Sequence, residues 1–128
     1  MKLSLTLDGQ ETAIDTGRFP DGAVWAHLLP PLRPQANVLT LRATAMQSMD
    51  DLMLVAQLLD AARQRYTLTL TTLELPWLPY ARQDRNMRDG DSFALKVFAG
   101  FINQLGFDGV KVLDPHSDVA AGVLDRMM

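Results

Sequence analysis

The stretch Asn37-Val38-Leu39-Thr40-Leu41 begins the part of the sequence that decides the fold, because a helix and then a second strand follow it. Residues 37–41 read as a short buried strand. Over residues 48–65, apolar side chains recur every three or four positions, which is the spacing of an amphipathic helix. Residues 66–75 return to strand-type alternation and are rich in Thr and Leu. This order predicts two parallel strands joined by a crossover helix.

The ends of this helix carry the residues that helix ends favour. Ser48 is a suitable N-cap, and Asp50 and Asp51 follow in the first turn, where negative charge suits the helix dipole. Arg63 and Arg65 lie in the last turn, where positive charge is favourable. These signals predict a helix that starts near residue 48 and ends near residue 65.

The alternation continues towards the end of the chain. A second amphipathic helix is predicted over 93–105, with Gly106 ending it, followed by a strand at 110–113 and a last helix over 119–127. Strands that alternate with helices predict an α/β fold with a parallel sheet flanked by helices.

Before this unit, the chain opens with a predicted β-hairpin. Leu3, Leu5 and Leu7 share one face of a strand, Asp8-Gly9 is a turn signal, and a second strand is expected over 11–15. Residues 17–35 are predicted to be a loop. The prolines in this segment exclude a regular helix through 28–35; they are Pro20, Pro30, Pro31 and Pro34.

Composition narrows the class of protein. The chain has 128 residues, a formal net charge of −3 and a hydrophobic fraction of 48%, as expected for one globular domain rather than a disordered chain. Its acidity argues against a non-specific nucleic-acid binder, and no apolar run approaches the roughly 20 residues that span a membrane. Cysteine is absent, which excludes disulfide and thiolate-zinc sites and fits a reducing cytoplasm. We therefore expect a cytoplasmic, single-domain, soluble protein without nucleic-acid or membrane partners.

Ligands of parallel α/β sheets bind beyond the carboxyl ends of the strands, which selects two loops here. The first loop, after Leu75, carries Arg82, Arg85 and Arg88 within seven positions. Guanidinium groups make bidentate contacts with phosphate oxygens, and the neighbouring Gln83 adds an amide. The alternative is a solvated loop in which the arginines pair with nearby aspartates.

The second loop, after Leu113, reads Asp114-Pro115-His116-Ser117-Asp118. A histidine between two carboxylates offers nitrogen and oxygen ligands to Mg²⁺ or to its water shell. The alternatives are that Asp118 caps the last helix and that His116 only closes a turn. Glycine-rich phosphate loops are absent, so any nucleotide would be held by the arginine loop.

At Pro79-Tyr80-Ala81-Arg82-Gln83-Asp84-Arg85 the sequence resembles the ATP-binding loop of ribose-phosphate pyrophosphokinases, also called phosphoribosyl pyrophosphate synthetases. Three further stretches are similar to the family in order and approximate spacing. They are residues 18–22, residues 51–63 of the first long helix, and Asp114-Pro115-His116, which is similar to the Asp-Leu-His segment of the family.

The resemblance implies a phosphoribosyltransferase-like three-layer fold and transfer of diphosphate from MgATP to ribose 5-phosphate, with AMP released. Arg82 and Gln83 would hold ATP, and Asp84 and Arg85 would shape the same loop. Phe19 and Asp21 would reach the adenine of an ATP bound to a neighbouring subunit of a homo-oligomer. His116 would ligate Mg²⁺, and Asp114 would orient that site.

The sequence also departs from the family pattern. Ala23 stands where the family has Glu after Asp-Gly, Pro115 replaces Leu, and Val119 stands where many members have Gln. The ribose-phosphate loop of the family and its flexible loop with the catalytic Lys have no counterpart in residues 1–128.

We therefore expect residues 1–128 to be the N-terminal ATP-binding and oligomerisation domain of such an enzyme, with no catalytic residue of its own and no activity alone. Ribose 5-phosphate would bind through the missing second domain. The alternatives are a non-catalytic relative that regulates or scaffolds the enzyme, and an unrelated α/β binding module.

Overall fold

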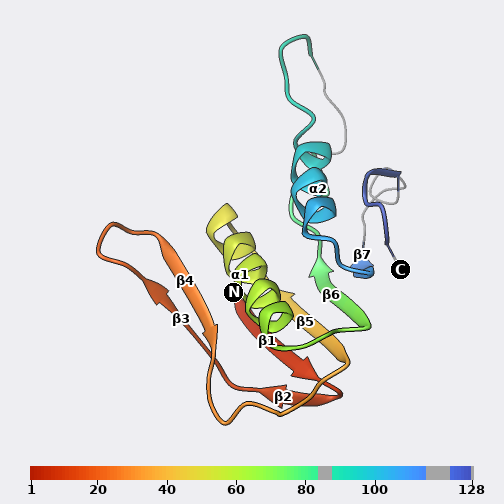
Figure 1. Ribbon diagram of the computed structural model, residues 1–128. Coiled ribbons are helices and arrows are strands. Elements are labelled where there is room, and N and C mark those ends of the chain that lie inside the picture. Colours follow the sequence, from red (N-terminus) through yellow and green to blue (C-terminus); the bar gives the residue numbers. More distant parts are fainter. Residues whose placement is uncertain (84–87, 115–121, 128) are drawn as a thin grey trace.

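The computed structural model describes residues 1–83, 88–114 and 122–127, apart from the side chain of Asp114. Its main feature is a five-stranded sheet of order β2-β1-β5-β6-β7 (Figure 1). The strands of this sheet are β1 (Lys2–Leu7), β2 (Gln10–Thr12), β5 (Val38–Thr44), β6 (Leu70–Trp77) and β7 (Gly109–Asp114). Two α-helices are described, α1 (Met49–Arg65) and α2 (Ala94–Leu105).

The predicted parallel unit is confirmed, since β5, β6 and β7 are parallel neighbours joined through α1 and α2. The N-terminal hairpin is confirmed as well: Asp8 and Gly9 have φ values of 51° and 82°, as its two-residue turn requires. β1 lies antiparallel to β5, so the hairpin extends the sheet and makes it mixed. The second predicted strand, over 11–15, is divided between β2 and a separate hairpin.

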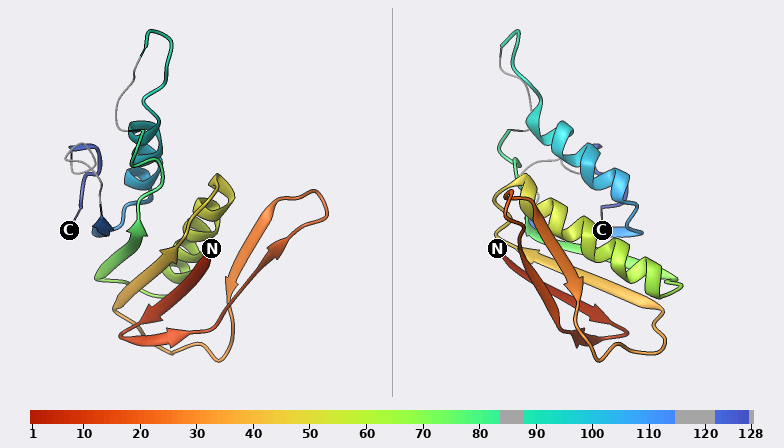
Figure 2. Two further views of the ribbon diagram at one scale, coloured as in Figure 1. Left: turned by 180° about the vertical axis from the view of Figure 1, so that it is seen from behind. Right: turned by 60° about the vertical axis from the view of Figure 1, so that its left-hand side comes forward.

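Both described helices lie on the same face of the sheet (Figure 2). The two crossovers run in the same direction across the sheet, and right-handed connections then place both helices on one side. That face is apolar and buried, with Leu5, Leu41, Leu73 and Val110 in one row across four strands. On the other face, Arg42, Glu74 and Lys111 are register partners, so the strands alternate apolar and polar residues.

The ends of α1 are close to those predicted. Ser48 is the N-cap residue, although its side chain makes no capping hydrogen bond; the carboxylate of Asp51 instead accepts a hydrogen bond from the Gln47 amide at 2.7 Å. At the other end, the Arg63 guanidinium donates to the carbonyls of Leu105 and Gly106, each at 2.9 Å. Arg63 therefore ties the end of α1 to the end of α2.

The predicted loop over 17–35 is wrong in its first half. β3 (Ile14–Arg18) and β4 (Val24–Leu28) form a separate two-stranded sheet that packs on α1 (Figure 1). Val24-Trp25-Ala26-His27-Leu28 alternates in the way an edge strand does, but four nearby prolines obscured this signal. The exclusion of a helix through 28–35 is confirmed, as this segment has no helical residue.

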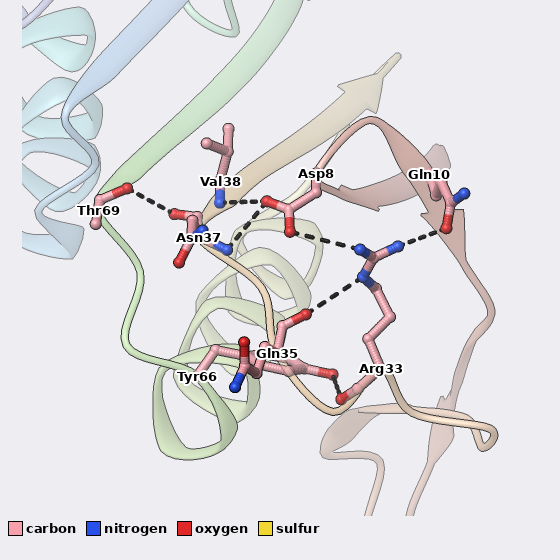
Figure 3. A network of polar contacts seen from close by, with 8 residues as sticks. All are labelled: Asp8, Gln10, Arg33, Gln35, Asn37, Val38, Tyr66 and Thr69. Carbon is pink, nitrogen blue, oxygen red and sulfur yellow. Dashed lines mark hydrogen bonds and ion pairs between the residues drawn. The ribbon is translucent and has the colours of Figure 1, made fainter.

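A polar network holds the proline-rich segment after β4 against the β1–β2 turn (Figure 3). The Asp8 carboxylate accepts hydrogen bonds from the Asn37 and Val38 amides at 3.0 and 2.9 Å, and Arg33 pairs with it at 3.5 Å. Arg33 also donates to the Gln10 side chain, and the Tyr66 hydroxyl donates to the Arg33 carbonyl at 2.8 Å. Tyr66 thus belongs to this network rather than to the predicted strand, which begins at Leu70.

The predicted last helix over 119–127 is wrong in its described part. Only Gly122 and Val123 are helical, and Met127 forms a parallel bridge with Val110. The Val110 amide donates to the Arg126 carbonyl at 2.9 Å, so pairing at the free edge of β7 replaces helical turns. Among the described residues, no helix is long and apolar enough to cross a membrane.

Candidate functional site at the carboxyl edge of the sheet

The two predicted ligand loops begin side by side at one edge of the sheet. Trp77, the last residue of β6, is the register partner of Asp114, the last residue of β7. The prediction that both loops leave the same edge is therefore confirmed. Asp84, Arg85 and His116 lie outside the described residues, as does the side chain of Asp114.

The first part of the arginine loop is held by two consecutive turns. The Ala81 amide donates to the Leu78 carbonyl at 3.3 Å, and the Gln83 amide donates to the Tyr80 carbonyl at 2.9 Å. Leu78 is buried in the core below these turns. Arg82 and Gln83 are exposed, so both predicted ATP ligands project from a supported segment.

The start of α2 fixes the same loop from the other side. The Leu95 amide donates to the Gln83 carbonyl at 3.1 Å, and the Tyr80 ring lies 5.4 Å from the Phe98 ring, centroid to centroid. Phe98 is buried on α2. The sheet and α2 together therefore position Arg82 and Gln83.

Arg88 behaves as the solvated-loop alternative predicts. Its guanidinium makes an exposed ion pair with Asp91, three residues later, at 3.4 Å. Ion pairs of this kind contribute little to stability.

Phe19 and Asp21 lie at the tip of the β3–β4 hairpin. Phe19 is 55% exposed, and the Asp21 carboxylate accepts a hydrogen bond from the Ala23 amide at 3.0 Å. Arg18 ties the tip to α1 through an ion pair with Asp50 at 2.9 Å. The β3–β4 hairpin lies to one side of α1, and the segment that leads from β6 to α2 lies to the other side (Figures 1 and 2).

A complete metal site is not formed by the part of the chain that the structure describes, since it holds no group of three or more potential metal ligands. What the structure does place is the backbone of Asp114, at the carboxyl end of β7 and next to β6. Mg²⁺ is commonly bound by one or two carboxylates together with substrate phosphates, and the Mg²⁺ role of Asp114 and His116 stays a prediction.

Sequence reasoning assigned no role to two residues at this edge. Trp77 is 60% exposed, and Tyr80 is 45% exposed with a φ of 63°. For Trp77, the sequence offered one signal, which is an aromatic residue next to the end of a predicted strand. The sequence carries no signal for the backbone conformation of Tyr80.

Residues 2–106 match the family model described as the N-terminal domain of ribose phosphate pyrophosphokinase. A ribose-phosphate pyrophosphokinase of Nitrosomonas europaea is 34% identical over 112 residues, which is 87% of this chain and 35% of that protein. Ribose-phosphate pyrophosphokinase 1, chloroplastic, of Oryza sativa subsp. japonica is 31% identical over 88% of this chain and 28% of its own length. The chain thus spans about a third of the length of these relatives.

The solved structure of phosphoribosylpyrophosphate synthetase from Mycobacterium smegmatis superimposes with a TM-score of 0.73. The match covers 94% of this chain and 40% of the solved chain, at 24% sequence identity, and supports the α/β fold. Together with the family match over residues 2–106, the order of elements and the arginine loop lead to one conclusion: this chain belongs to the family of N-terminal domains of ribose phosphate pyrophosphokinases.

Proposed function

We propose that residues 1–128 form the ATP-binding and oligomerisation domain of a cytoplasmic ribose-phosphate pyrophosphokinase. The complete reaction would transfer diphosphate from MgATP to ribose 5-phosphate and release AMP. Arg82 and Gln83 would hold the nucleotide, with Asp84 and Arg85 in the same loop. Ribose 5-phosphate would be bound by a second domain.

The observation that carries this proposal is the support given to the arginine loop. Two turns, a buried Leu78 and the first turn of α2 hold Arg82 and Gln83 at the carboxyl edge of the sheet. Guanidinium groups on a supported loop suit phosphoryl transfer, because catalysis there depends on positioning and on neutralising charge.

Mg²⁺ would be held at the same edge. His116 and Asp114 would supply protein ligands, and the phosphates of ATP would supply the others, as is usual for Mg²⁺. The position of Asp114 beside the end of β6 supports this role.

Homo-oligomerisation would complete the nucleotide site. Phe19 and Asp21 project at the tip of a hairpin that lies away from the arginine loop of the same chain (Figure 1). A second subunit is the simplest source of an ATP for these residues to contact. The exposed Phe19 supports an association in which this side chain becomes covered.

The direct test is AMP release from MgATP by the full-length natural chain, with and without ribose 5-phosphate. Sugar-dependent AMP release is expected from that protein and not from residues 1–128 alone, because positioning the sugar contributes many orders of magnitude to such rates. Sugar-dependent AMP release by residues 1–128 alone would contradict the proposal that ATP and ribose 5-phosphate are bound by two different domains. ATP binding without turnover by the full-length chain would favour the non-catalytic relative.

A further inference from the structure

Tyr80 has a backbone conformation that its side chain disfavours. Its φ is 63°, in the left-handed region, and the other described residues that combine a side chain with a positive φ are Asp8 and Ala45. Asp8 belongs to a tight hairpin turn, and aspartate enters this region more easily than most residues do. For a bulky residue such as Tyr80, the left-handed conformation is roughly tenfold less populated than ordinary backbone conformations. The surrounding structure must therefore impose it, and strain of this kind is concentrated at functional sites.

The contact that stands against this strain is made by the Tyr80 ring. It lies 5.4 Å from the Phe98 ring, centroid to centroid, with the two planes tilted by 47°. Phe98 is 3% exposed on the buried face of α2, so its ring is a fixed support. Tilted aromatic pairs at this separation attract each other beyond what their burial contributes. The Tyr80–Phe98 contact therefore offsets the strain, although Tyr80 stays 45% exposed.

The conformation of Tyr80 determines where the next residues of the arginine loop lie. The Tyr80 carbonyl accepts a hydrogen bond from the Gln83 amide at 2.9 Å, and the Gln83 carbonyl accepts one from the Leu95 amide at 3.1 Å. Since each residue has only two soft dihedral angles, a relaxed Tyr80 would turn the following peptides in another direction and break this pair of bonds. Arg82, which lies between Tyr80 and Gln83, would move with them.

We propose that Tyr80 is a positioning residue for the nucleotide. The contact of its ring with Phe98 holds residue 80 in the left-handed conformation, and this conformation presets Arg82 and Gln83 for the phosphates of ATP. A loop that is ordered before the ligand arrives binds more tightly, because less freedom is lost on binding. This inference rests on the proposed function, and it adds a residue that acts through Arg82 and Gln83.

The test is the ATP affinity, with Mg²⁺ present, of the full-length natural chain and three variants at position 80. Tyr80→Phe keeps the ring and should keep the affinity. Tyr80→Ala loses the ring but still disfavours a positive φ, so the loop should relax in most molecules and ATP affinity should fall about tenfold. Tyr80→Gly also loses the ring, but glycine adopts positive and negative φ about equally, so affinity should fall only about twofold.

The order of these variants separates positioning from two other roles of Tyr80. A ring that touched ATP directly would make Tyr80→Ala and Tyr80→Gly equally weak binders. A ring that only stabilised the fold would lower the melting temperature and leave ATP affinity unchanged. Ribose 5-phosphate, which the proposed function assigns to a second domain, should bind equally well to all four proteins, and this control shows that each variant is folded.

The partner ring gives a second test. Phe98→Leu keeps an apolar side chain in the core but removes the aromatic pair, so ATP affinity should fall severalfold. The same change in the Tyr80→Ala background should have no further effect, because the contact is already absent there.

Three results would overturn the inference. They are equal ATP affinities of Tyr80→Ala and Tyr80→Gly, effects of Tyr80→Ala and Phe98→Leu that simply add, and unchanged ATP affinity in Tyr80→Ala. Each of these leaves the proposed function intact, because the wild-type protein still binds ATP. Absence of ATP binding in the wild-type protein would instead reject the proposed function, and this inference with it.

Discussion

The side-chain amide of Gln57 makes hydrogen bonds with the edge of β4 at Ala26, as a neighbouring strand would. The Ala26 amide donates to Gln57 Oε1 at 2.8 Å, and Gln57 Nε2 donates to the Val24 carbonyl at 2.9 Å. One side chain on α1 therefore satisfies a donor and an acceptor at the outer edge of β4. The hairpin that carries Phe19 and Asp21 is fastened to α1 in this way.

Replacing this amide should release the hairpin without unfolding the domain. In Gln57→Leu, two hydrogen bonds worth about 0.5–1.5 kcal/mol each are lost, so exchange of the Ala26 amide hydrogen should become faster. Gln64→Leu is the matched control, because Gln64 lies on the same helix and, among the described residues, its amide donates to Asp60 alone, at 2.7 Å. Equal Ala26 exchange in the two variants would contradict the role of Gln57.

Gly17 is required by the indole of Trp25. A Cβ atom at residue 17 would lie 2.8 Å from Trp25 Cε2 and closer still to Cζ2, so the ring would have to move. Gly17→Ala should therefore lower the free energy of unfolding by about 1–3 kcal/mol in urea titrations.

The matched control for this change is Gly100→Ala on α2, where nothing lies within 4 Å of the new Cβ. Alanine favours a helix more than glycine does, so this variant should be more stable by about 0.5–1 kcal/mol. If both glycine variants shift stability in the same direction, the close approach of Trp25 does not matter.

Asp8 should make the domain sensitive to acid. Backbone hydrogen bonds from Val38 and Asn37, aided by Arg33, hold the pKa of the Asp8 carboxyl below its ordinary value of 3.8. A lowered pKa in the folded state means that the stabilisation is complete above pH 3.8 and is lost as the pH falls through the folded-state pKa.

The measurement is the urea midpoint of wild type and Asp8→Asn between pH 7 and pH 2. Asparagine tolerates the left-handed conformation of residue 8, whose φ is 51°, but it cannot ionise. The variant should be less stable at pH 7 and should approach the wild type at low pH. Parallel stability curves across this range would show that Asp8 does not titrate with folding.

His116 should affect the metal dependence of nucleotide binding. In His116→Ala, we expect more Mg²⁺ to be needed for tight ATP binding, because one protein ligand is removed. Titration of Mg²⁺ at fixed ATP, with melting temperature as a control, separates this role from closure of a turn. Superimposable Mg²⁺ curves together with a lower melting temperature would support the turn alone.

The central βαβαβ unit was predictable because each element has a strong local signal. The three-to-four spacing of Leu52, Val55 and Leu59 marks α1, and Gly106 marks the end of α2 with a φ of 76°. The β3–β4 hairpin was not predicted, because its strands are short and depend on a contact from Gln57, which is distant in the sequence. The end of the chain was mistaken for a helix because its pairing with Val110 is also non-local.

The candidate site likewise has one part that the sequence predicted and one part that it did not. Arg82 and Gln83 were predicted as ATP ligands from a recognisable motif, and the register of Trp77 with Asp114 confirms that the two loops start together. The support of Gln83 by α2 and the strained Tyr80 could not be read from the sequence, because both depend on how α2 packs beside β6.

The measurement that tests the nucleotide site most directly is calorimetric ATP binding, with Mg²⁺ present, to the full-length natural chain and to two arginine variants. Arg82→Ala should weaken binding by about 1.5–3 kcal/mol, the cost of a lost charge-assisted contact. Arg88→Ala removes the same charge from the same loop, and the contact that Arg88 makes among the described residues is an exposed ion pair with Asp91, so it should change binding by less than about 0.5 kcal/mol. Equal affinity of the wild type and Arg82→Ala for ATP would contradict the assignment of this loop.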